Sequence, residues 1–274
     1  MAQTDYLVIH DAACARGETT YLDPASGLMV FTRLGLLARG RCCGAGCRHC
    51  PFEHQAVPLE HRSRRIQQAA WLSEARPRDG ARPVVLFWSG GKDSFLALRA
   101  LEGAGAGEII LLSCFDAARR MIEHQEIAIE QVIAQARALG RPLIGVPLHP
   151  GGDYLAQILP ALDLAGPCER LAFGDLKSEA IRTWREETLG AHERTGALTL
   201  EFPLWRADYD ALFGALSEAL EATGAQCVIS AVSPAVPGIA VGERFDRALA
   251  ARLPEGVDRF GANGEFFTRM VFSG

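Results

Sequence analysis

The stretch that decides the fold is "VVLFWSGGKDSFLALRALEG", residues 84–103. An apolar run typical of a strand meets Ser-Gly-Gly-Lys-Asp-Ser, and an amphipathic helical pattern then begins. A glycine-rich turn between a buried strand and a helix presents free backbone N–H groups and the positive end of the helix. Gly90 and Gly91 let the backbone approach an anion closely, because they have no Cβ. The stretch therefore predicts a phosphate-binding loop.

The polar side chains of this loop fit the same ligand. Ser89 and Ser94 add hydroxyl donors, and Lys92 adds a positive charge. Asp93 would repel phosphate unless a cation intervenes, which indicates either Mg²⁺ or a helix N-cap. The alternative is an ordinary strand-to-helix turn. We expect ATP to be bound by Ser89, Gly90, Gly91, Lys92, Asp93 and Ser94.

Two common nucleotide motifs are excluded. A Walker loop needs a glycine five positions before Gly91, where Leu86 stands, and a Ser or Thr where Asp93 stands. The dinucleotide fingerprint GxGxxG is also absent. The loop must therefore belong to another class of nucleotide site.

Outward from this loop, apolar runs alternate with helical patterns. The runs indicate strands at 83–88, 108–114, 142–148, 169–174, 198–203 and 226–232. The helical patterns lie at 93–102, 122–139, 177–189 and 208–222, and "GANGEFFTRMVF" (261–272) predicts a turn followed by a strand. The second pattern would place His124 and Gln125 at a helix start. Near-continuous apolar strands between helices indicate an α/β fold, a parallel sheet with helices on both faces.

The loop Ser89–Ser94 resembles the PP-loop of ATP pyrophosphatases, which split ATP into AMP and pyrophosphate. Further along, "EHQEIAIEQVIAQARALGRPLIGVPL", "FGDLKSEAIRTWREE", "EFPLW" and "GANGEFFT" are similar, in this order, to the diphthine–ammonia ligase (diphthamide synthase) family. The resemblance covers roughly residues 83–274. It implies a Rossmann-like PP-loop/HUP fold, ATP and Mg²⁺ as ligands, and catalytic roles for Lys92, Asp93 and Glu265.

The chain departs from this family at two positions. The family's closing motif usually reads Gly-Glu-Asn-Gly-Glu-Phe-His-Thr, whereas Ala262 and Phe267 stand here in place of the first Glu and the His. A carboxylate and an imidazole are therefore missing from the substrate side. We therefore expect that the protein either uses an acceptor other than diphthine or binds a nucleotide without performing the family reaction.

Further site candidates lie beyond the loop. Asp175 follows an apolar run, at the end of a strand where ligands bind in such sheets, although it could instead cap a helix. Arg182 and Arg185, three residues apart, would clamp phosphate or carboxylate, or else face solvent. Asn263 and Gly264 also suit a simple hairpin turn. The substrate-binding candidates are Asp175, Arg182, Asn263, Gly264 and Glu265.

Four thiols gather in "RCCGAGCRHCP", residues 41–51. In a reducing cytoplasm such a cluster favours a metal over disulfides, and four thiolates suit tetrahedral Zn²⁺. The spacing Cys43-x3-Cys47-x2-Cys50 also fits a three-thiolate 4Fe–4S cluster, and a metal-free cluster is the third option. Residues 27–52 resemble a small uncharacterised bacterial cysteine-rich module. The metal-ligand candidates are Cys42, Cys43, Cys47 and Cys50. By contrast, Cys114 and Cys227 lie in apolar runs and are expected to be buried.

Charge and composition suggest a division of labour. Residues 1–80 carry 10 Arg and 8 Asp or Glu, a net +2, whereas the rest carries 18 Lys or Arg and 25 Asp or Glu, a net −7. We expect a cysteine-rich module at 1–57, a linker helix and loop at 58–82, and the PP-loop domain at 83–274. No secretory leader or apolar run of about 20 residues is present, so we expect a cytoplasmic protein without a membrane partner.

These observations predict an ATP-dependent, AMP-forming ligase that adenylates a carboxylate or amide oxygen and transfers ammonia or an amine. Its partner would be a small-molecule or protein acceptor. The alternative is a tRNA-modifying PP-loop enzyme, in which the basic cysteine module holds RNA. A non-catalytic nucleotide-binding protein is the third class.

Overall fold

The structure is a computed structural model that describes residues 6–272. Its centre is a six-stranded sheet with the order β10-β9-β4-β5-β8-β3. Five strands run parallel, and β3 joins the edge antiparallel to β8. The predicted α/β fold is therefore confirmed, with one antiparallel edge strand added. The strands are β3 (Ala70–Trp71), β4 (Val84–Phe87), β5 (Ile109–Asp116), β8 (Leu143–Leu148), β9 (Arg170–Ala172) and β10 (Thr199–Glu201).

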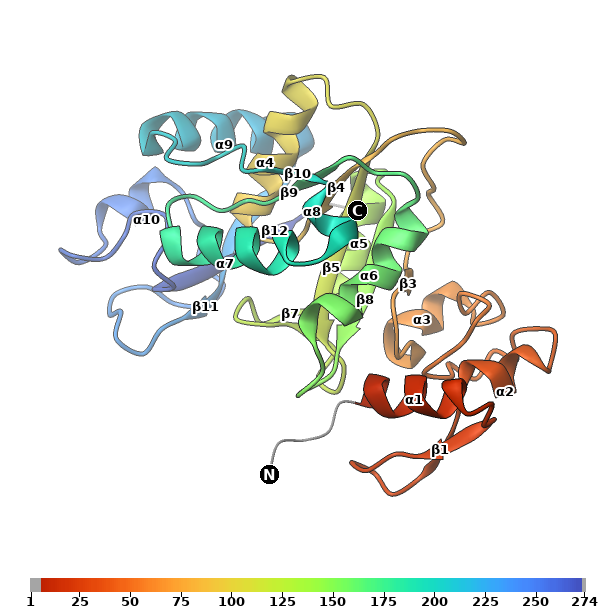
Figure 1. Ribbon diagram of the computed structural model, residues 1–274. Helices are drawn as coiled ribbons and strands as arrows, with labels where there is room; N and C mark the ends of the chain where they lie inside the picture. The colour runs from red at the N-terminus through yellow and green to blue at the C-terminus, as the bar shows by residue number, and fades with distance from the viewer. Residues whose placement is uncertain (1–5, 273–274) are drawn as a thin grey trace.

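Both faces of the sheet are covered by helices (Figure 1). Val84 and Leu86 point into one hydrophobic core and Val85 into the other, because successive strand residues face opposite sides. Helices α4 (Lys92–Gly103), α5 (Ile129–Ala138) and α9 (Tyr209–Thr223) pack on the first face, and α6 (Tyr154–Ala165) and α7 (Glu179–Gly190) on the second. Burial on both sides explains why the strands read as almost unbroken apolar runs.

The C-terminal strands form a separate hairpin. We expected 226–232 to join the parallel sheet, but β11 (Gln226–Val232) pairs antiparallel with β12 (Phe266–Val271) in a two-stranded sheet of its own. The strand predicted after the turn at 261 is β12, and it supplies this partner. The hairpin shares the core of α4 and α9, so its apolar residues are buried without the main sheet. The short helices α8 (Glu193–Gly196) and α10 (Arg247–Ala251) complete this half.

The helix predicted at 122–139 begins later than expected. Strands β6 (Met121–Ile122) and β7 (Ile127–Ala128) first form a small hairpin, and α5 starts at Ile129. His124 has a φ of 63°, in the left-handed region that a helix does not use. His124 and Gln125 therefore lie in a turn, not at a helix start. Helix α6 was not anticipated, and it contains Pro160.

The N-terminal part is more helical than its sequence suggested. It contains α1 (Tyr6–Ala15), β1 (Thr20–Leu22), β2 (Met29–Phe31) and α2 (Arg33–Leu37), followed by α3 (Leu59–Arg65). The sequence of residues 1–57 shows no convincing pattern of a long helix, and the ten-residue α1 corrects that interpretation. The predicted linker also supplies β3 to the main sheet. Residues 1–5 and 273–274, the ends of the predicted module and PP-loop domain, lie outside the described residues.

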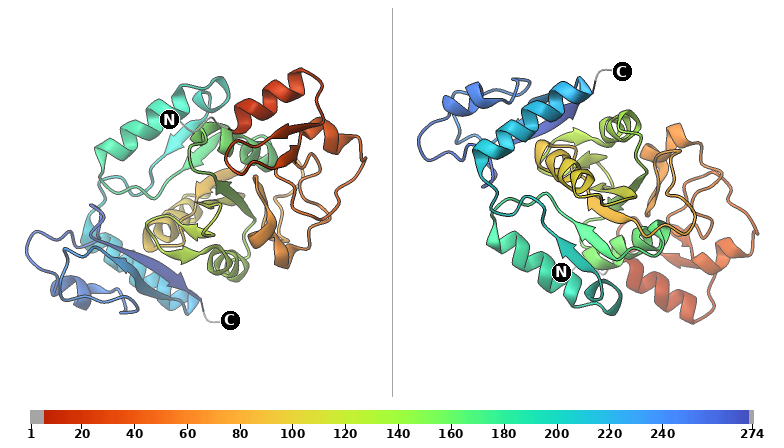
Figure 2. Two further views of the ribbon diagram at one scale, coloured as in Figure 1. Left: turned by 90° about the horizontal axis from the view of Figure 1, so that it is seen from below. Right: turned by 90° about the horizontal axis from the view of Figure 1, so that it is seen from above.

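The N-terminal part and the C-terminal hairpin lie on opposite sides of the central sheet (Figure 2). None of the helices formed by residues 6–272 is long and apolar enough to cross a membrane.

Candidate functional site

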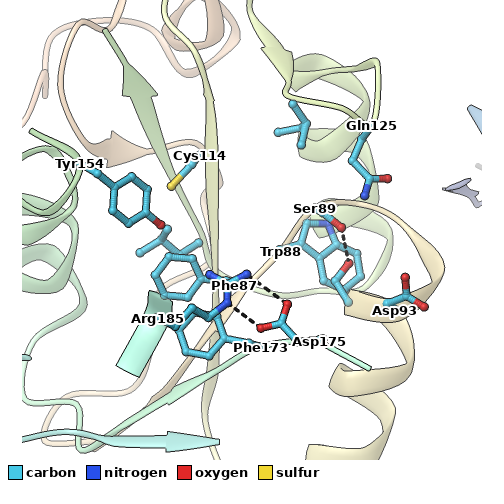
Figure 3. Close-up of a pocket in the computed structure, with 14 residues that line it drawn as sticks. Phe87, Trp88, Ser89, Asp93, Cys114, Gln125, Tyr154, Phe173, Asp175 and Arg185 are labelled. Atoms are coloured by element: carbon cyan, nitrogen blue, oxygen red, sulfur yellow. Dashed lines mark hydrogen bonds and ion pairs between the residues drawn. The ribbon is translucent and has the colours of Figure 1, made fainter. Parts of the chain in front are cut away.

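A cavity of about 290 Å³ opens at the carboxyl ends of β4, β5 and β9 (Figure 3). This is where open α/β sheets bind their ligands. Ser89, Asp93 and Gln125 lie on one side of it, and Tyr154 and Cys114 lie on the other. The cavity therefore has a polar side formed by the glycine-rich loop and a largely aromatic side. The remaining lining residues include Phe87, Trp88, Ser94, Phe173, Asp175 and Arg185.

The glycine-rich loop adopts a conformation that its two glycines permit. Gly90 has a φ of 81°, and Gly91 is extended and caps the N-terminus of α4. The Ser94 hydroxyl donates to the Gly91 carbonyl over 3.0 Å and lies 3.2 Å from the Ser89 hydroxyl. Both serines line the cavity.

Lys92 and Asp93 form an ion pair at the start of α4. The Lys92 ammonium lies 3.0 Å from Asp93 Oδ2 and 5.3–5.8 Å from the ring centroids of Phe245, Phe260 and Phe266. The Lys92 side chain is only 3% exposed and does not line the cavity. Its positive charge therefore lies behind the loop and not in the cavity wall.

Asp93 lines the cavity with an unsatisfied oxygen. Its Oδ1 is buried and has no hydrogen-bond partner among residues 6–272, although part of the side chain is exposed. Burial raises the pKa of Asp93, and the nearby Lys92 charge offsets part of that effect. The Oε1 of Gln125, also at the cavity, is likewise buried without a partner in the described part of the chain. Both oxygens can accept from or coordinate a ligand.

Asp175 lies in the cavity wall and holds an arginine. Arg185 donates to its two carboxylate oxygens over 2.6 and 3.2 Å and lies 4.3 Å above the Phe173 ring. Arg182, the arginine we proposed for the substrate, lies outside the cavity lining and pairs with Glu186 over 2.8 Å. The structure therefore brings Arg185, rather than Arg182, into the site.

Asn263, Gly264 and Glu265 form the turn that leads into β12. The Glu265 carboxylate accepts from the backbone N–H groups of Asp258 and Asn263, each over 3.0 Å, and from the Asn263 amide over 2.9 Å. Burial opposes the charge of Glu265, but these hydrogen bonds outweigh it and lower its pKa. None of the three residues lines the cavity, so in this structure Glu265 braces the turn.

The substituted position Phe267 faces a histidine from another element. Its ring stacks on His124 with centroids 6.1 Å apart and planes inclined by 20°. The β6–β7 turn thus places an imidazole beside the position where the family motif has one. Ala262 packs against the hydrophobic core.

Several cavity residues were not predicted. Tyr154 comes from the unanticipated helix α6, and Phe173 and Gly174 come from a motif in which we singled out Asp175 and two arginines but not these residues. A Cβ on Gly174 would lie 2.8 Å from the backbone of Asp93, so glycine is required for the segment after β9 to pass the start of α4. Cys114 was expected to be buried; it is only partly buried and lines the cavity. Burial raises the pKa of its thiol to about 12, so it is a protonated, weakly polar wall group rather than a nucleophile.

The four clustered cysteines lie as two pairs of sulfurs. Cys43 and Cys47 are 3.7 Å apart, and Cys42 and Cys50 are 3.8 Å apart. Within residues 6–272, no three or more Cys, His, Asp or Glu side chains are arranged to hold a metal ion. Zinc binding is therefore not shown.

The doubly covered sheet with a strand–SGGKDS–helix loop at its carboxyl edge defines a PP-loop nucleotide-binding domain. Comparison with known families agrees with this class: residues 82–191 match the diphthamide synthase N-terminal domain. Residues 82–191, which include the loop, are therefore similar to a domain of the PP-loop ATP pyrophosphatase family that the loop and later motifs resembled. Residues 9–56 match a family of unknown function, DUF5522, which coincides with the cysteine-rich region. This match supports nucleotide binding by residues 82–191 and implies ATP and Mg²⁺ as the ligands.

Proposed function

We propose that the protein is an AMP-forming ligase that adenylates a carboxylate or amide oxygen of its acceptor. The observation that carries this proposal is the cavity, which joins the PP-loop to an aromatic wall. Phosphates fit the side formed by Ser89 and Ser94, where the helix end and hydroxyls favour anions. A purine fits against the aromatic side of the cavity, where the Phe87 and Phe173 rings stack on each other with their centroids 4.6 Å apart.

Mg²⁺ would be held at Asp93. Its Oδ1 is buried without a hydrogen-bond partner among the described residues, which fits a cation ligand at this point. Mg²⁺ commonly uses one or two carboxylates together with substrate phosphates, so a cage of several protein ligands is not needed. A bound Mg²⁺ would neutralise charge on the leaving pyrophosphate.

The proposed reaction has two steps. An acceptor oxygen attacks the α-phosphorus of ATP, and the bond to the β-phosphate oxygen breaks to release pyrophosphate. Ammonia or an amine then attacks the adenylated carbon and releases AMP, with its proton passing to solvent. Donors already directed at the leaving pyrophosphate would supply most of the rate enhancement, and here these are the loop amides, Ser89 and the buried charge of Lys92.

Isotope exchange tests the first step. Adenylation is reversible, so labelled pyrophosphate should enter ATP when the protein, Mg²⁺ and a fraction containing the acceptor are combined. Fractions of a cell extract supply candidate acceptors. ATP binding without exchange in any fraction would favour a nucleotide-binding protein that does not adenylate.

An RNA acceptor is a second candidate, supported by the N-terminal module. Residues 24–52 contain no Asp or Glu. Arg33, Arg39 and Arg41 are exposed, and none forms an ion pair within residues 6–272. Unpaired arginines on one exposed segment suit the phosphate backbone of RNA.

We further propose that the four clustered thiols bind one metal ion, and that it is zinc. Two sulfurs bound to one tetrahedral ion at about 2.3 Å would lie roughly 3.8 Å apart. The Cys43–Cys47 and Cys42–Cys50 separations of 3.7 and 3.8 Å match this value. An iron–sulfur cluster binds each thiolate to a different iron, which holds the sulfurs farther apart.

Backbone donors around these sulfurs support the same proposal. The Gly44 N–H donates to Cys42 Sγ over 3.5 Å, and Cys50 accepts from the N–H groups of Phe52 and His54. Such outer hydrogen bonds stabilise and orient metal-bound thiolates. Because no single point is yet surrounded by three ligands, binding would draw the two pairs together.

A further inference from the structure

The carbonyl oxygen of Gly90 accepts two hydrogen bonds from outside the loop. The backbone N–H of Met270 in β12 donates to it over 2.9 Å, and the side-chain amide of Gln135 in α5 donates over 3.0 Å. These donors lie 45 residues (Gln135) and 180 residues (Met270) further along the chain than Gly90. Two donors from two elements fix the direction of this carbonyl.

Gln135 connects three parts of the site. Its side chain is buried, and the residue is 3% exposed. Its Oε1 accepts from the Trp88 indole over 2.9 Å, while its Nε2 also donates to the Met270 carbonyl over 2.8 Å. An indole N–H only donates and a carbonyl only accepts, so the partners determine which way the amide points. Gln135 therefore ties the end of β4, the loop and β12 together.

Because the direction of the Gly90 carbonyl is fixed, the direction of the Gly91 N–H is fixed as well. In a trans peptide the carbonyl of Gly90 and the N–H of Gly91 point in opposite directions. The Gly91 N–H indeed lies toward the Ser89 hydroxyl, 3.3 Å away, and Ser89 lines the cavity. The long contact leaves this N–H available to an anion.

A peptide between two glycines needs such a restraint. Glycine populates positive and negative φ about equally, so the Gly90–Gly91 peptide can turn over at little cost. Turned over, it would present a carbonyl oxygen to the phosphates in place of a donor. The two glycines thus let the loop backbone approach the phosphates closely. They do not by themselves keep the Gly91 N–H directed at the ligand.

We propose that Gln135 is a positioning residue that holds the Gly90–Gly91 peptide in its anion-binding orientation. The inference rests on the proposed function, because it assumes that pyrophosphate or the ATP phosphates occupy the loop. Gln135 itself does not touch the ligand. Its removal should therefore weaken phosphate binding selectively and leave the aromatic side of the cavity intact.

The test compares two ligands by calorimetry on the full-length protein with Mg²⁺. Pyrophosphate probes the loop, and adenosine probes the cavity without phosphates. In Gln135→Met we expect pyrophosphate affinity to fall about tenfold or more, the effect of a lost hydrogen bond to a charged ligand. Adenosine affinity should stay within about twofold of the wild type. Gln135→Glu keeps the acceptor for Trp88 and the volume but loses both donors, so it should show the same selectivity.

Gln157→Met is the matched control, because Gln157 is also a buried glutamine with two hydrogen bonds but lies in α6 away from the loop. It should change neither affinity. Equal losses for both ligands in the Gln135 variants would mean a general structural role and would overturn the inference, as would unchanged pyrophosphate binding. If the wild type binds neither ATP nor pyrophosphate, the proposed function itself fails.

Discussion

The side chain of Lys92 is a buried positive charge next to the glycine-rich loop. Its ammonium group is enclosed by three phenylalanine rings and the Asp93 carboxylate, and it is almost fully buried. A buried ammonium is costly unless it is paired, and cation–π contacts together with the ion pair offset that cost. Held in this way, the charge is placed before the ligand arrives and is not screened by solvent.

We predict that Lys92→Ala lowers ATP affinity by about tenfold or more, because a charge next to the phosphates is lost. Lys177→Ala is the matched control: Lys177 is the only other lysine in the chain, pairs with Asp258 and lies 5.6 Å from the Tyr209 ring. Calorimetric titration of ATP should show a loss only in the first variant. Equal affinity of both variants for ATP would place the phosphates away from this loop.

At the scale of elements, the turn that leads into β12 depends on one carboxylate. Glu265 accepts three hydrogen bonds that hold residues 258–263, and these lower its pKa from the ordinary value of 4.5. A carboxyl group with a lowered folded-state pKa stabilises the fold fully above its unfolded pKa. That contribution disappears as the pH falls through the folded value.

We therefore predict that Glu265→Gln lowers the Tm at pH 7 by roughly 2–4 °C, the effect of about 1 kcal/mol in a domain of this size. The difference from wild type should shrink as the pH falls below about 4.5. Thermal unfolding followed by circular dichroism between pH 7 and 3.5 measures it. Glu255→Gln, an exposed neighbour, should have no effect. A difference that does not depend on pH would contradict the assigned role of the charge.

The cysteine cluster gives the second prediction at this scale. Elemental analysis of anaerobically purified protein should find about one zinc per chain without a visible absorption band. Cys43→Ser and Cys50→Ser should lose the metal, and Cys168→Ser, outside the cluster, should keep it. Iron with a visible band would establish the cluster alternative. Protein free of metal, or with disulfides detected by mass spectrometry, would contradict any metal site.

The local elements were the part of this fold that the sequence predicted well. The loop, β4, α4 and the apolar strands follow from residue patterns over short distances. The partner of β11, the start of α5 and the choice of Arg185 over Arg182 depend on contacts between distant segments, which no local pattern contains. Tyr154 shows the same limit, since it reaches the cavity from a helix whose internal proline hid its pattern.

At the scale of the whole molecule, the N-terminal module docks beside the site without entering it. Tyr6 of the module packs edge-on against His149 with ring centroids 5.1 Å apart, and in the adjoining linker the Ile66 carbonyl accepts from Arg120 over 2.9 Å. All residues that line the cavity lie between 87 and 185. We therefore propose that the module holds an acceptor rather than ATP.

Neutralising the module's free arginines tests this division of labour. In the full-length triple variant Arg33→Gln, Arg39→Gln, Arg41→Gln, ATP affinity should stay within about twofold of wild type. If the acceptor is RNA, its binding should weaken and depend less steeply on salt, since each lost phosphate contact lowers the slope by about one. Filter binding of cellular RNA at several salt concentrations measures this. Unchanged RNA binding would remove the support for the RNA candidate.

The central claim is that the cavity cleaves ATP between its α- and β-phosphates. The most direct measurement is phosphorus NMR of the products formed from ATP and Mg²⁺ by the full-length protein in the presence of a cell extract, with Lys92→Ala as the background. We predict AMP and pyrophosphate in equal amounts, produced only by the wild type, with inorganic pyrophosphatase of the extract inhibited. Formation of ADP and phosphate by the purified wild type, and not by the variant, would contradict the account.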